Sequence, residues 1–400
     1  MIVQPKVRGF ICTTAHPQGC AKHVTQWIDY VKKHSPIKNG PKRVLIIGSS
    51  TGFGLASRIA AAFGAGAETI GVFFEKPASG KRTASAGWYS TAAFERAANE
   101  AGLYAKSFNG DAFSNEMKAE VLKTIKEDWG GDIDLVIYSI ASPRRQDPKS
   151  GEIFNSVLKP IGKPYQNKTV DVMTGAVTDI TIEPATEAEI KATEVVMGGE
   201  DWEMWIDALL KEKLLANNAT SVAFTYIGPE ITHPIYRNGT IGKAKEHLEK
   251  TASTLDKKLQ KAVGGHALIS VNKALVTQAS AAIPVVPLYV SLLYKIMKTK
   301  NLHEGCIEQM WRLFVDHLYH NDAPVDGNGR IRIDDWEMRD DVQNEVAQLW
   351  QQVSSENLEK ISDVQGYRSD FYRLFGFGLN GVDYNQDVDV NVNIPSIPEE

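Results

Sequence analysis

The sequence predicts an α/β fold with a mostly parallel sheet that is covered by helices on both faces. Short apolar, β-branched runs alternate with helical stretches from residue 43 onward, which is typical of parallel sheets. The run Ile133–Ile140 is apolar throughout, as expected for a strand that is buried on both faces. A chain of 400 residues with 43% hydrophobic and 23% charged residues can bury the core that such a sheet requires.

The expected elements of this sheet follow in a regular order. The predicted strands are Arg43–Ile47, Thr69–Phe74, Ala105–Phe108, Ile133–Ile140, Ser221–Tyr226 and Ala267–Asn272. The predicted helices between them are Ser57–Phe63, Ala92–Ala101, Glu116–Trp129 and Thr240–Val263. Two alternating runs, Thr169–Met173 and Val177–Ile182, flank Thr174–Gly175 and predict a hairpin inserted near the site.

The composition argues against several classes of protein. The net charge is −5 and no basic block occurs, so we expect no nucleic-acid partner. The N-terminus lacks the apolar core of a signal peptide, and the apolar tract Ile283–Leu293 is too short to span a membrane. Three cysteines do not suggest a disulfide framework. We therefore expect a cytoplasmic enzyme with no membrane partner.

The strongest motif is Gly48-Ser-Ser-Thr-Gly52-Phe-Gly54, which follows the first strand and opens a helix. Its glycines permit a tight turn and let backbone N–H groups approach a pyrophosphate, as in Rossmann-type dinucleotide sites. The GxxxGxG spacing is the form seen in short-chain-dehydrogenase-like proteins. The cofactor-binding residues expected here are Gly48, Ser49, Ser50, Thr51, Gly52, Phe53 and Gly54.

Further cofactor contacts are expected at the ends of the next strands. Glu75 can accept hydrogen bonds from the adenosine ribose hydroxyls and would repel a 2′-phosphate, so NADH is favoured over NADPH. Asp111 is placed to bind the adenine amino group, and small residues follow the fourth strand beneath the nicotinamide ribose. The expected contacts are Phe74, Glu75, Asp111, Ala112, Ser139 and Ile140.

Two tyrosine–lysine pairs could serve a reductase of this fold. Tyr236 lies in a loop before a helix that begins near Thr240, and Lys245 follows in its second turn, with Lys243 as a local competitor. The pair Tyr294 and Lys298 has the common Tyr-x3-Lys spacing, but it lies in the late apolar tract. We interpret that second pair as a helix face.

The motif around the first pair resembles a known family. Tyr226-Ile-Gly-Pro-Glu-Ile-Thr-His-Pro-Ile-Tyr236, followed by Gly239–Lys245, is similar to the bacterial trans-2-enoyl-CoA and enoyl-acyl-carrier-protein reductases of about 400 residues with a Tyr-x8-Lys pair. The same resemblance covers the segments 48–54, 74–77, 86–89, 275–280 and 283–289. It runs over essentially the whole chain.

The resemblance implies specific roles for these residues. Tyr236 would be the proton donor, Lys245 the cofactor-binding lysine and Tyr226 a substrate contact. Leu275, Val276 and Thr277 would contact the nicotinamide end, and the helix Pro287–Met297 would form the wall of the acyl pocket. The family implies a monomer that acts on an enoyl thioester carried by acyl carrier protein or CoA, a choice that the sequence leaves open.

We expect one decorated domain over residues 1–400. Its parts would be an N-terminal extension (1–42), a dinucleotide-binding half (43–150), an insertion at the substrate side (151–216), a catalytic and acyl-pocket half (217–300) and a helical C-terminal part (301–400). The acidic tail Asn385–Glu400 is expected to be loosely packed at its end.

The predicted function is NADH-dependent reduction of the C2=C3 double bond of trans-2-enoyl thioesters in fatty-acid elongation. Hydride would add to C3, and Tyr236 would stabilise and protonate the enolate. One alternative is an NAD(P)H-dependent carbonyl reductase or alcohol dehydrogenase of the short-chain type, which would use the same pair on a C=O group. Another is a non-catalytic dinucleotide sensor, which would leave the tyrosine–lysine pair without a purpose.

Two segments resemble metal sites only superficially. Cys12, His16, Cys20 and His23 do not have zinc-finger spacing, and neighbouring proline and glycine suggest a loop. The segment Asp326–Asp335 fails the spacing of a calcium loop and is interpreted as a glycine-rich turn. We therefore expect no metal.

Overall fold

A seven-stranded parallel sheet forms the centre of the protein. The computed structural model describes residues 1–320 and 324–398. The strand order is β13-β12-β11-β6-β3-β4-β5, and every neighbouring pair is parallel. Their bounds are β3 (Arg43–Ile47), β4 (Glu68–Phe73), β5 (Ala105–Asn109), β6 (Ile133–Tyr138), β11 (Leu215–Thr225), β12 (His266–Val271) and β13 (Arg330–Arg332). The predicted fold class is confirmed.

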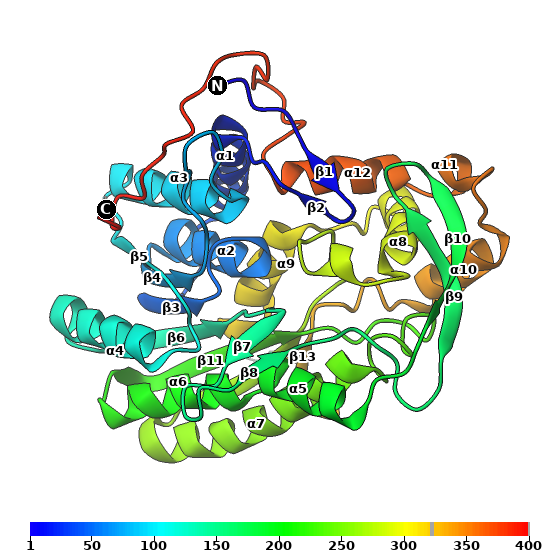
Figure 1. The fold of residues 1–400 in the computed structure, drawn as a ribbon. Helices are drawn as coiled ribbons and strands as arrows, with labels where there is room; N and C mark the ends of the chain where they lie inside the picture. Colours follow the sequence, from blue (N-terminus) through cyan, green and yellow to red (C-terminus); the bar gives the residue numbers. More distant parts are fainter. Residues whose placement is uncertain (321–323, 399–400) are drawn as a thin grey trace.

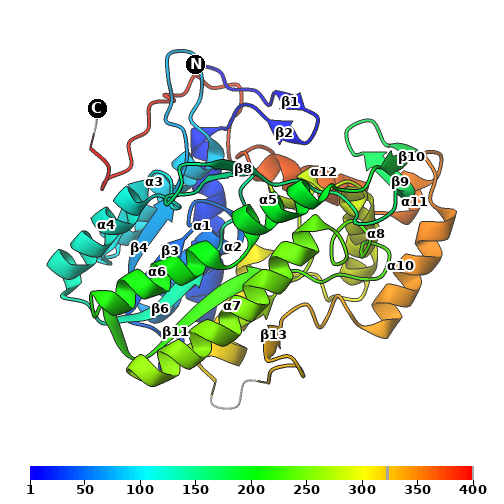
Figure 2. The same cartoon turned by 60° about the horizontal axis from the view of Figure 1, so that its bottom comes forward.

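Helices cover both faces of this sheet (Figure 1). On one face lie α4 (Asn115–Thr124), α6 (Glu200–Lys211) and α7 (Thr240–Val263), and Figure 2 brings α6 and α7 forward side by side. On the other lie α1 (Pro17–His34), α2 (Gly52–Ile59), α3 (Ala86–Glu100) and α9 (Cys306–Arg312). Successive residues of β3 enter opposite cores, Val44 and Ile46 on one side and Leu45 and Ile47 on the other, as the period of a strand requires.

The remaining elements surround the carboxyl edge of the sheet. The hairpins are β1 (Val7–Arg8) with β2 (Ile11–Cys12), β7 (Arg144–Gln146) with β8 (Ile153–Asn155), and β9 (Tyr165–Asp171) with β10 (Ala176–Ile182). The other helices are α5 (Glu187–Met197), α8 (Val286–Thr299), α10 (Asp340–Gln352), α11 (Leu358–Ile361) and α12 (Val364–Arg373). Short π-helical turns continue α2 over Ala60–Gly64, α4 over Ile125–Trp129 and α9 over Leu313–Leu318, and Ser280–Ala282 forms a 3₁₀ turn.

The predicted hairpin is present as β9 and β10, which pair antiparallel with Tyr165 opposite Ile182. Two helices begin earlier than expected. The helix predicted from Ser57 begins at Gly52, because the glycine motif forms its first turn. The helix predicted from Ala92 begins at Ala86. Within the described residues, no helix is both long enough and apolar enough to cross a membrane.

The loop predicted around Pro17 and Gly19 is wrong, because these residues begin α1. Proline is favourable in a first helical turn, where its missing N–H would have no partner. His16 caps the helix by accepting a hydrogen bond from Gly19 N at 3.1 Å. The helix buries Val24 and Val31 in the core, so it belongs to the fold.

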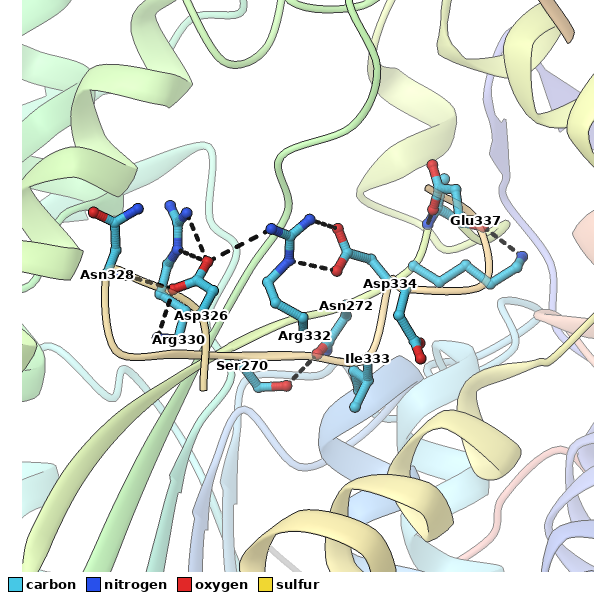
Figure 3. A network of polar contacts seen from close by, with 12 residues as sticks. Ser270, Asn272, Asp326, Asn328, Arg330, Arg332, Ile333, Asp334 and Glu337 are labelled. Atoms are coloured by element: carbon cyan, nitrogen blue, oxygen red, sulfur yellow. Dashed lines mark hydrogen bonds and ion pairs between the residues drawn. The ribbon is translucent and has the colours of Figure 1, made fainter. Parts of the chain in front are cut away.

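The turn predicted over Asp326–Asp335 is only partly correct. The segment begins with a turn, in which Gly329 N donates to Asp326 O, but it continues as β13 beside β12. Figure 3 shows that the Asp326 carboxylate is occupied by Arg330 and Arg332. Ile331 and Ile333 are buried, whereas Arg330 and Arg332 are held in ion pairs. Charged side chains on an edge strand discourage pairing with another chain.

The C-terminal tail is better packed than expected. Val388, Val390 and Ile394 are buried, and the chain runs across α3 (Figure 1). Trp88 Nε1 donates to Val392 O at 2.6 Å, and the Tyr89 hydroxyl donates to Val390 O at 2.8 Å. Apolar side chains between the acidic residues therefore hold the tail down, while residues 399 and 400 lie outside the described residues.

Candidate active site

The glycine loop crosses the carboxyl edge of the sheet at very close range. Gly48 has φ of 92°, and a Cβ there would lie 2.1 Å from the carbonyl oxygen of Ser139. A Cβ on Gly54 would lie 1.9 Å from Gly48 O. Gly52, at φ of 54°, is the first residue of α2, and Thr51 is its N-cap. Because only glycine fits these positions, the backbone N–H groups lie open at a helix N-terminus, which suits a pyrophosphate.

Glu75 lies directly beside this loop. Ser50 Oγ donates to Glu75 Oε1 at 2.8 Å, and a Cβ on Gly87 would lie 2.0 Å from the same oxygen. Burial raises the pKa of the Glu75 carboxyl, while hydrogen bonds from Ser85 and Ser50 oppose that shift. Asn109 fixes the backbone by exchanging hydrogen bonds with Glu75 N and O. Ser85, Gly87 and Asn109 were not among the predicted residues, although each lies near a predicted motif.

The other residues expected at the adenosine end also follow strand ends. Phe74 is 78% exposed, which is unusual for a phenylalanine and leaves its ring open for stacking. Asp111 Oδ1 accepts a hydrogen bond from Phe113 N at 2.9 Å, and Ala112 O accepts one from Lys118 Nζ at 2.9 Å. Ser49 of the glycine loop differs from these residues, because its hydroxyl donates inward to Val72 O at 3.3 Å.

A cavity of about 620 Å³ lies between the glycine loop and the ends of β6, β11 and β12. The predicted residues that line it are Phe53, Ser139, Ile140, Tyr226, Tyr236, Lys245, Leu275 and Thr277. Val276 and Gly52 instead line a second cavity of about 570 Å³ behind this wall, which Leu275 also borders. Thr277 N donates to Ser280 Oγ at 2.9 Å, so a local turn holds this segment over the strand end.

The helix Pro287–Met297, which the resemblance implied as the wall of an acyl pocket, does not line this cavity. The apolar wall comes instead from Ala282, Ile283 and Val286. Helix α8 is too deeply buried to face a ligand, since Leu288, Leu292 and Leu293 are fully covered. Only its first turn and the segment before it reach the cavity.

Tyr226 and Tyr236 pack edge to face, with ring centroids 5.0 Å apart and an interplanar angle of 77°. The Tyr236 hydroxyl has no hydrogen-bond partner among the described residues, and burial raises its pKa. Lys245 Nζ donates to Phe224 O at 3.2 Å. Burial lowers the Lys245 pKa to about 8, against the opposing charge of Glu249. A free hydroxyl and an ammonium group therefore share one buried cavity.

The competing residues have other partners. Lys243 is exposed and forms an ion pair with Glu246 at 2.9 Å. The Tyr294 hydroxyl accepts a hydrogen bond from Val276 N at 3.2 Å, and Lys298 pairs with Asp363 at 2.6 Å. Neither Tyr294 nor Lys298 lines the first cavity. This geometry favours Tyr236 and Lys245 as the reactive pair.

Comparison with protein-family models identifies the chain. Residues 82–319 match the model described as the trans-2-enoyl-CoA reductase catalytic region. The chain belongs to the trans-2-enoyl-CoA reductase family. Residues 2–80 match this family's NAD(P)H binding domain, and residues 325–388 match a model described as the enoyl reductase FAD binding domain.

Relatives of this family match over nearly the whole chain. The enoyl-[acyl-carrier-protein] reductase [NADH] of Coxiella burnetii is 69% identical and covers 99% of this chain and 98% of its own. The trans-2-enoyl-CoA reductase [NADH] of Ruminiclostridium cellulolyticum is 58% identical over 99% of this chain and 100% of its own. The crystal structure of the Clostridium acetobutulicum trans-2-enoyl-CoA reductase in complex with NADH superimposes with a TM-score of 0.96 at 46% identity, covering 100% of both chains. These matches confirm the family and the enzyme class predicted from the motifs.

One buried carboxyl group in this member of the family was missed by the sequence analysis. The Tyr226 hydroxyl lies 2.9 Å from Glu337 Oε1, and the two residues are 111 positions apart. Glu337 is fully buried. Nothing in the local pattern Trp336–Met338 distinguishes this glutamate from a surface residue, so only the folded chain reveals it.

Within the described residues, no group of three or more histidine, cysteine, aspartate or glutamate side chains is arranged to hold a metal ion. His16 illustrates why the four candidate ligands at the N-terminus do not converge. Its Nδ1 accepts the capping hydrogen bond of α1, and its ring packs edge to face on Tyr384 at 4.9 Å. Its role in the described structure is that of a buried helix cap.

Proposed function

We propose that the first cavity is where this NADH-dependent enoyl reductase acts on its thioester. The observation that carries the proposal is the free hydroxyl of Tyr236, which shares the buried cavity with Lys245. Reduction of an enoyl thioester requires a hydrogen-bond donor at the oxygen where negative charge develops. No other tyrosine that lines the cavity has an unoccupied hydroxyl within the described residues.

The residues at the strand ends fit a dinucleotide. The cradle formed by Gly48, Gly52 and Gly54 would receive the pyrophosphate, and it keeps its tight shape because a Cβ at Gly48 or Gly54 would collide with a backbone carbonyl oxygen. Glu75 would bind the adenosine ribose, with Phe74, Asp111 and Ala112 flanking the adenine. Ser139, Ile140 and the segment Leu275–Thr277 would surround the nicotinamide end. When bound, NADH supplies the hydride that adds to C3 of the enoyl group.

The side chains of the cavity supply the remaining steps. As negative charge moves onto the thioester oxygen, Tyr236 donates a hydrogen bond to it and then provides the proton. Lys245 uses its remaining N–H groups to hold the ribose, and its positive charge favours an anionic tyrosine. Tyr226, whose ring packs against Tyr236, contacts the substrate from the neighbouring side.

The carrier and the setting of the reaction belong to the same proposal. Ala282, Ile283 and Val286 give the cavity an apolar wall that suits an acyl chain. Relatives are named for acyl-carrier-protein and for CoA substrates, so either carrier fits the family. We propose that the enzyme acts as a monomer in the cytoplasm, without a membrane partner.

A direct assay tests this function. Oxidation of NADH is followed with crotonyl-CoA, with acetoacetyl-CoA and with the crotonyl group on acyl carrier protein. We expect turnover of the crotonyl thioesters and none of acetoacetyl-CoA, and the better carrier identifies the physiological one. Faster reduction of acetoacetyl-CoA would indicate a carbonyl reductase, and tight NADH binding without turnover would indicate a sensor.

A further inference from the structure

The carboxyl group of Glu337 lies behind the active-site tyrosines, fully buried at the end of the segment shown in Figure 3. Its Oε1 is 2.9 Å from the Tyr226 hydroxyl and 2.6 Å from the Tyr289 hydroxyl. Its Oε2 accepts a hydrogen bond from Ala274 N at 2.6 Å. Of the two tyrosines, only Tyr226 lines the cavity, and Ala274, which also lines it, contacts the carboxyl group through its backbone N–H.

The direction of one of these hydrogen bonds follows from Gln343. Its Nε2 donates to the Tyr289 hydroxyl oxygen at 3.1 Å and to the backbone oxygen of Glu337 at 2.6 Å. Tyr289 thus accepts from the amide, and its own hydrogen has Glu337 Oε1 as acceptor. Only the hydrogen between Tyr226 and Glu337 remains to be placed.

That hydrogen can be arranged in two ways, with different consequences for the cavity. A carboxylate has no hydrogen, so Tyr226 must donate its single hydrogen to Oε1 and has none left for a substrate. A carboxylic acid can donate from Oε1 to the tyrosine oxygen instead. The hydrogen of Tyr226 is then free to point into the cavity.

Burial shifts the Glu337 carboxyl group toward the acid form. Burial raises the pKa of its carboxyl group. The charge of Lys273 and the donors Tyr289 and Ala274 N oppose that rise, while the negative charge of Asp334 adds to it. Tyr226 is the remaining titratable group in contact with the carboxyl, and burial raises the pKa of Tyr226 well above its usual value, so the phenol keeps its hydrogen.

We propose that Glu337 is a positioning residue that acts through Tyr226. As a carboxylic acid it donates to the Tyr226 oxygen, and this turns the tyrosine's own hydrogen toward the thioester oxygen beside that of Tyr236. Two donors then face the developing enolate, where a carboxylate at Glu337 would leave one. The inference rests on the proposed function, because it assumes that the enolate forms in this cavity.

The variant Glu337→Gln separates the two forms. Ala274 N–H needs an acceptor, so the amide oxygen must take the place of Oε2 and the amide nitrogen must face the tyrosines. The nitrogen then donates to the Tyr226 oxygen, as the carboxylic acid does, but it cannot ionise. Tyr289 loses its acceptor, so we expect a lower melting temperature together with near-parental kcat at low pH.

The pH profile of kcat is the deciding measurement. The acid form is present below the pKa of Glu337 and is lost as pH rises through it, so parental kcat should fall on the alkaline side. We expect kcat to fall roughly tenfold, which corresponds to the free energy of about one hydrogen bond. Glu337→Gln should lack this fall and keep only the loss that belongs to Lys245. The matched control is Glu95→Gln, a buried carboxyl group on α3 whose substitution should leave the profile unchanged.

Tyr226→Phe provides an independent test that does not depend on how well Glu337→Gln folds. It should lower kcat about tenfold at low pH and should remove the Glu337-dependent fall. Adding Glu337→Gln to Tyr226→Phe should then change neither kcat nor its pH profile. The proposal is overturned if Glu337→Gln keeps the parental alkaline fall, or if Tyr226→Phe does. If the parent enzyme does not reduce enoyl thioesters at all, the proposed function fails instead.

Discussion

The cofactor half and the substrate half of the site rely on different kinds of groups. The cofactor half, from Gly48 to Ile140, is shaped at its glycine loop by backbone atoms and by the absence of side chains, and a Cβ added to Gly54 would lie only 1.9 Å from Gly48 O. The substrate half uses side-chain hydroxyls, an ammonium and a carboxyl group that come from residues 226 to 337. Added side-chain atoms at Gly48 or Gly54 should therefore disturb cofactor binding. Loss of a hydroxyl hydrogen in the substrate half should instead disturb catalysis.

This difference also separates what each half controls. The backbone cradle would set how tightly the dinucleotide binds, in the ground state and the transition state alike. The hydroxyl groups would act only as charge develops on the substrate, so they should change kcat more than binding. Variants in the cofactor half should therefore change NADH affinity more than kcat, and variants in the substrate half should change kcat more than NADH affinity.

The largest effect is expected at Tyr236. Tyr236→Phe keeps the ring packing against Tyr226 and removes only the hydroxyl, so kcat should fall by roughly 10²–10³, as for loss of one oxyanion donor. NADH affinity, measured by fluorescence titration, should be nearly unchanged. Tyr294→Phe is the matched control and should retain near-parental kcat. The assignment fails if the two phenylalanine variants show the reverse pattern.

The next effect is expected at Gly54, where the cradle is tightest. Gly54→Ala should weaken NADH binding by roughly 10–100-fold, because the loop must move to admit the methyl group, a strain of about 1–3 kcal/mol. Single-turnover kcat at saturating NADH should change far less. Gly327→Ala, which places its methyl group in open space, is the control. Unchanged NADH affinity in Gly54→Ala would contradict a pyrophosphate site at this loop.

A smaller effect is expected at Glu75. Glu75→Ala removes the carboxylate that would repel a 2′-phosphate, so the ratio of kcat/KM for NADH over NADPH should narrow by about tenfold, or about 1.4 kcal/mol. The exposed carboxylate of Glu187 provides a control, since Glu187→Ala should leave this ratio unchanged. A parent enzyme that already prefers NADPH would show that the role given to Glu75 is wrong.

The smallest effect is expected at the acyl wall. Ala282→Leu adds bulk to a side chain that lines the cavity, and kcat/KM should fall for dodecenoyl thioesters more than for crotonyl thioesters, by about threefold. The same change at Ala188, exposed on α5, should affect both substrates alike. Equal losses for the two substrates in Ala282→Leu would indicate that this segment is only core.

The sequence by itself determined the parts that depend on neighbours along the chain. Strand β3, helix α7 and the glycine loop were predicted from residues within a few positions of one another, because strand and helix periodicity and glycine sterics are local. Tyr236 and Lys245 stand on one loop and the helix that follows it, so a short motif sufficed to select them. The family, the NADH-dependent class and the fold class followed from the same motifs and are confirmed.

Only the tertiary structure decided the parts that depend on distant packing. Residues 287–297 do not line the first cavity, because burial of α8 against the C-terminal helices leaves only its first turn beside it. Backbone oxygens of the C-terminal tail accept hydrogen bonds from the side chains of Trp88 and Tyr89, which lie some 300 positions earlier in the chain. Glu337 reaches Tyr226 across 111 residues, and no local pattern encodes such a contact. A buried hydrogen bond is selected by the packing that excludes water around it, and that packing exists only once the whole chain has folded.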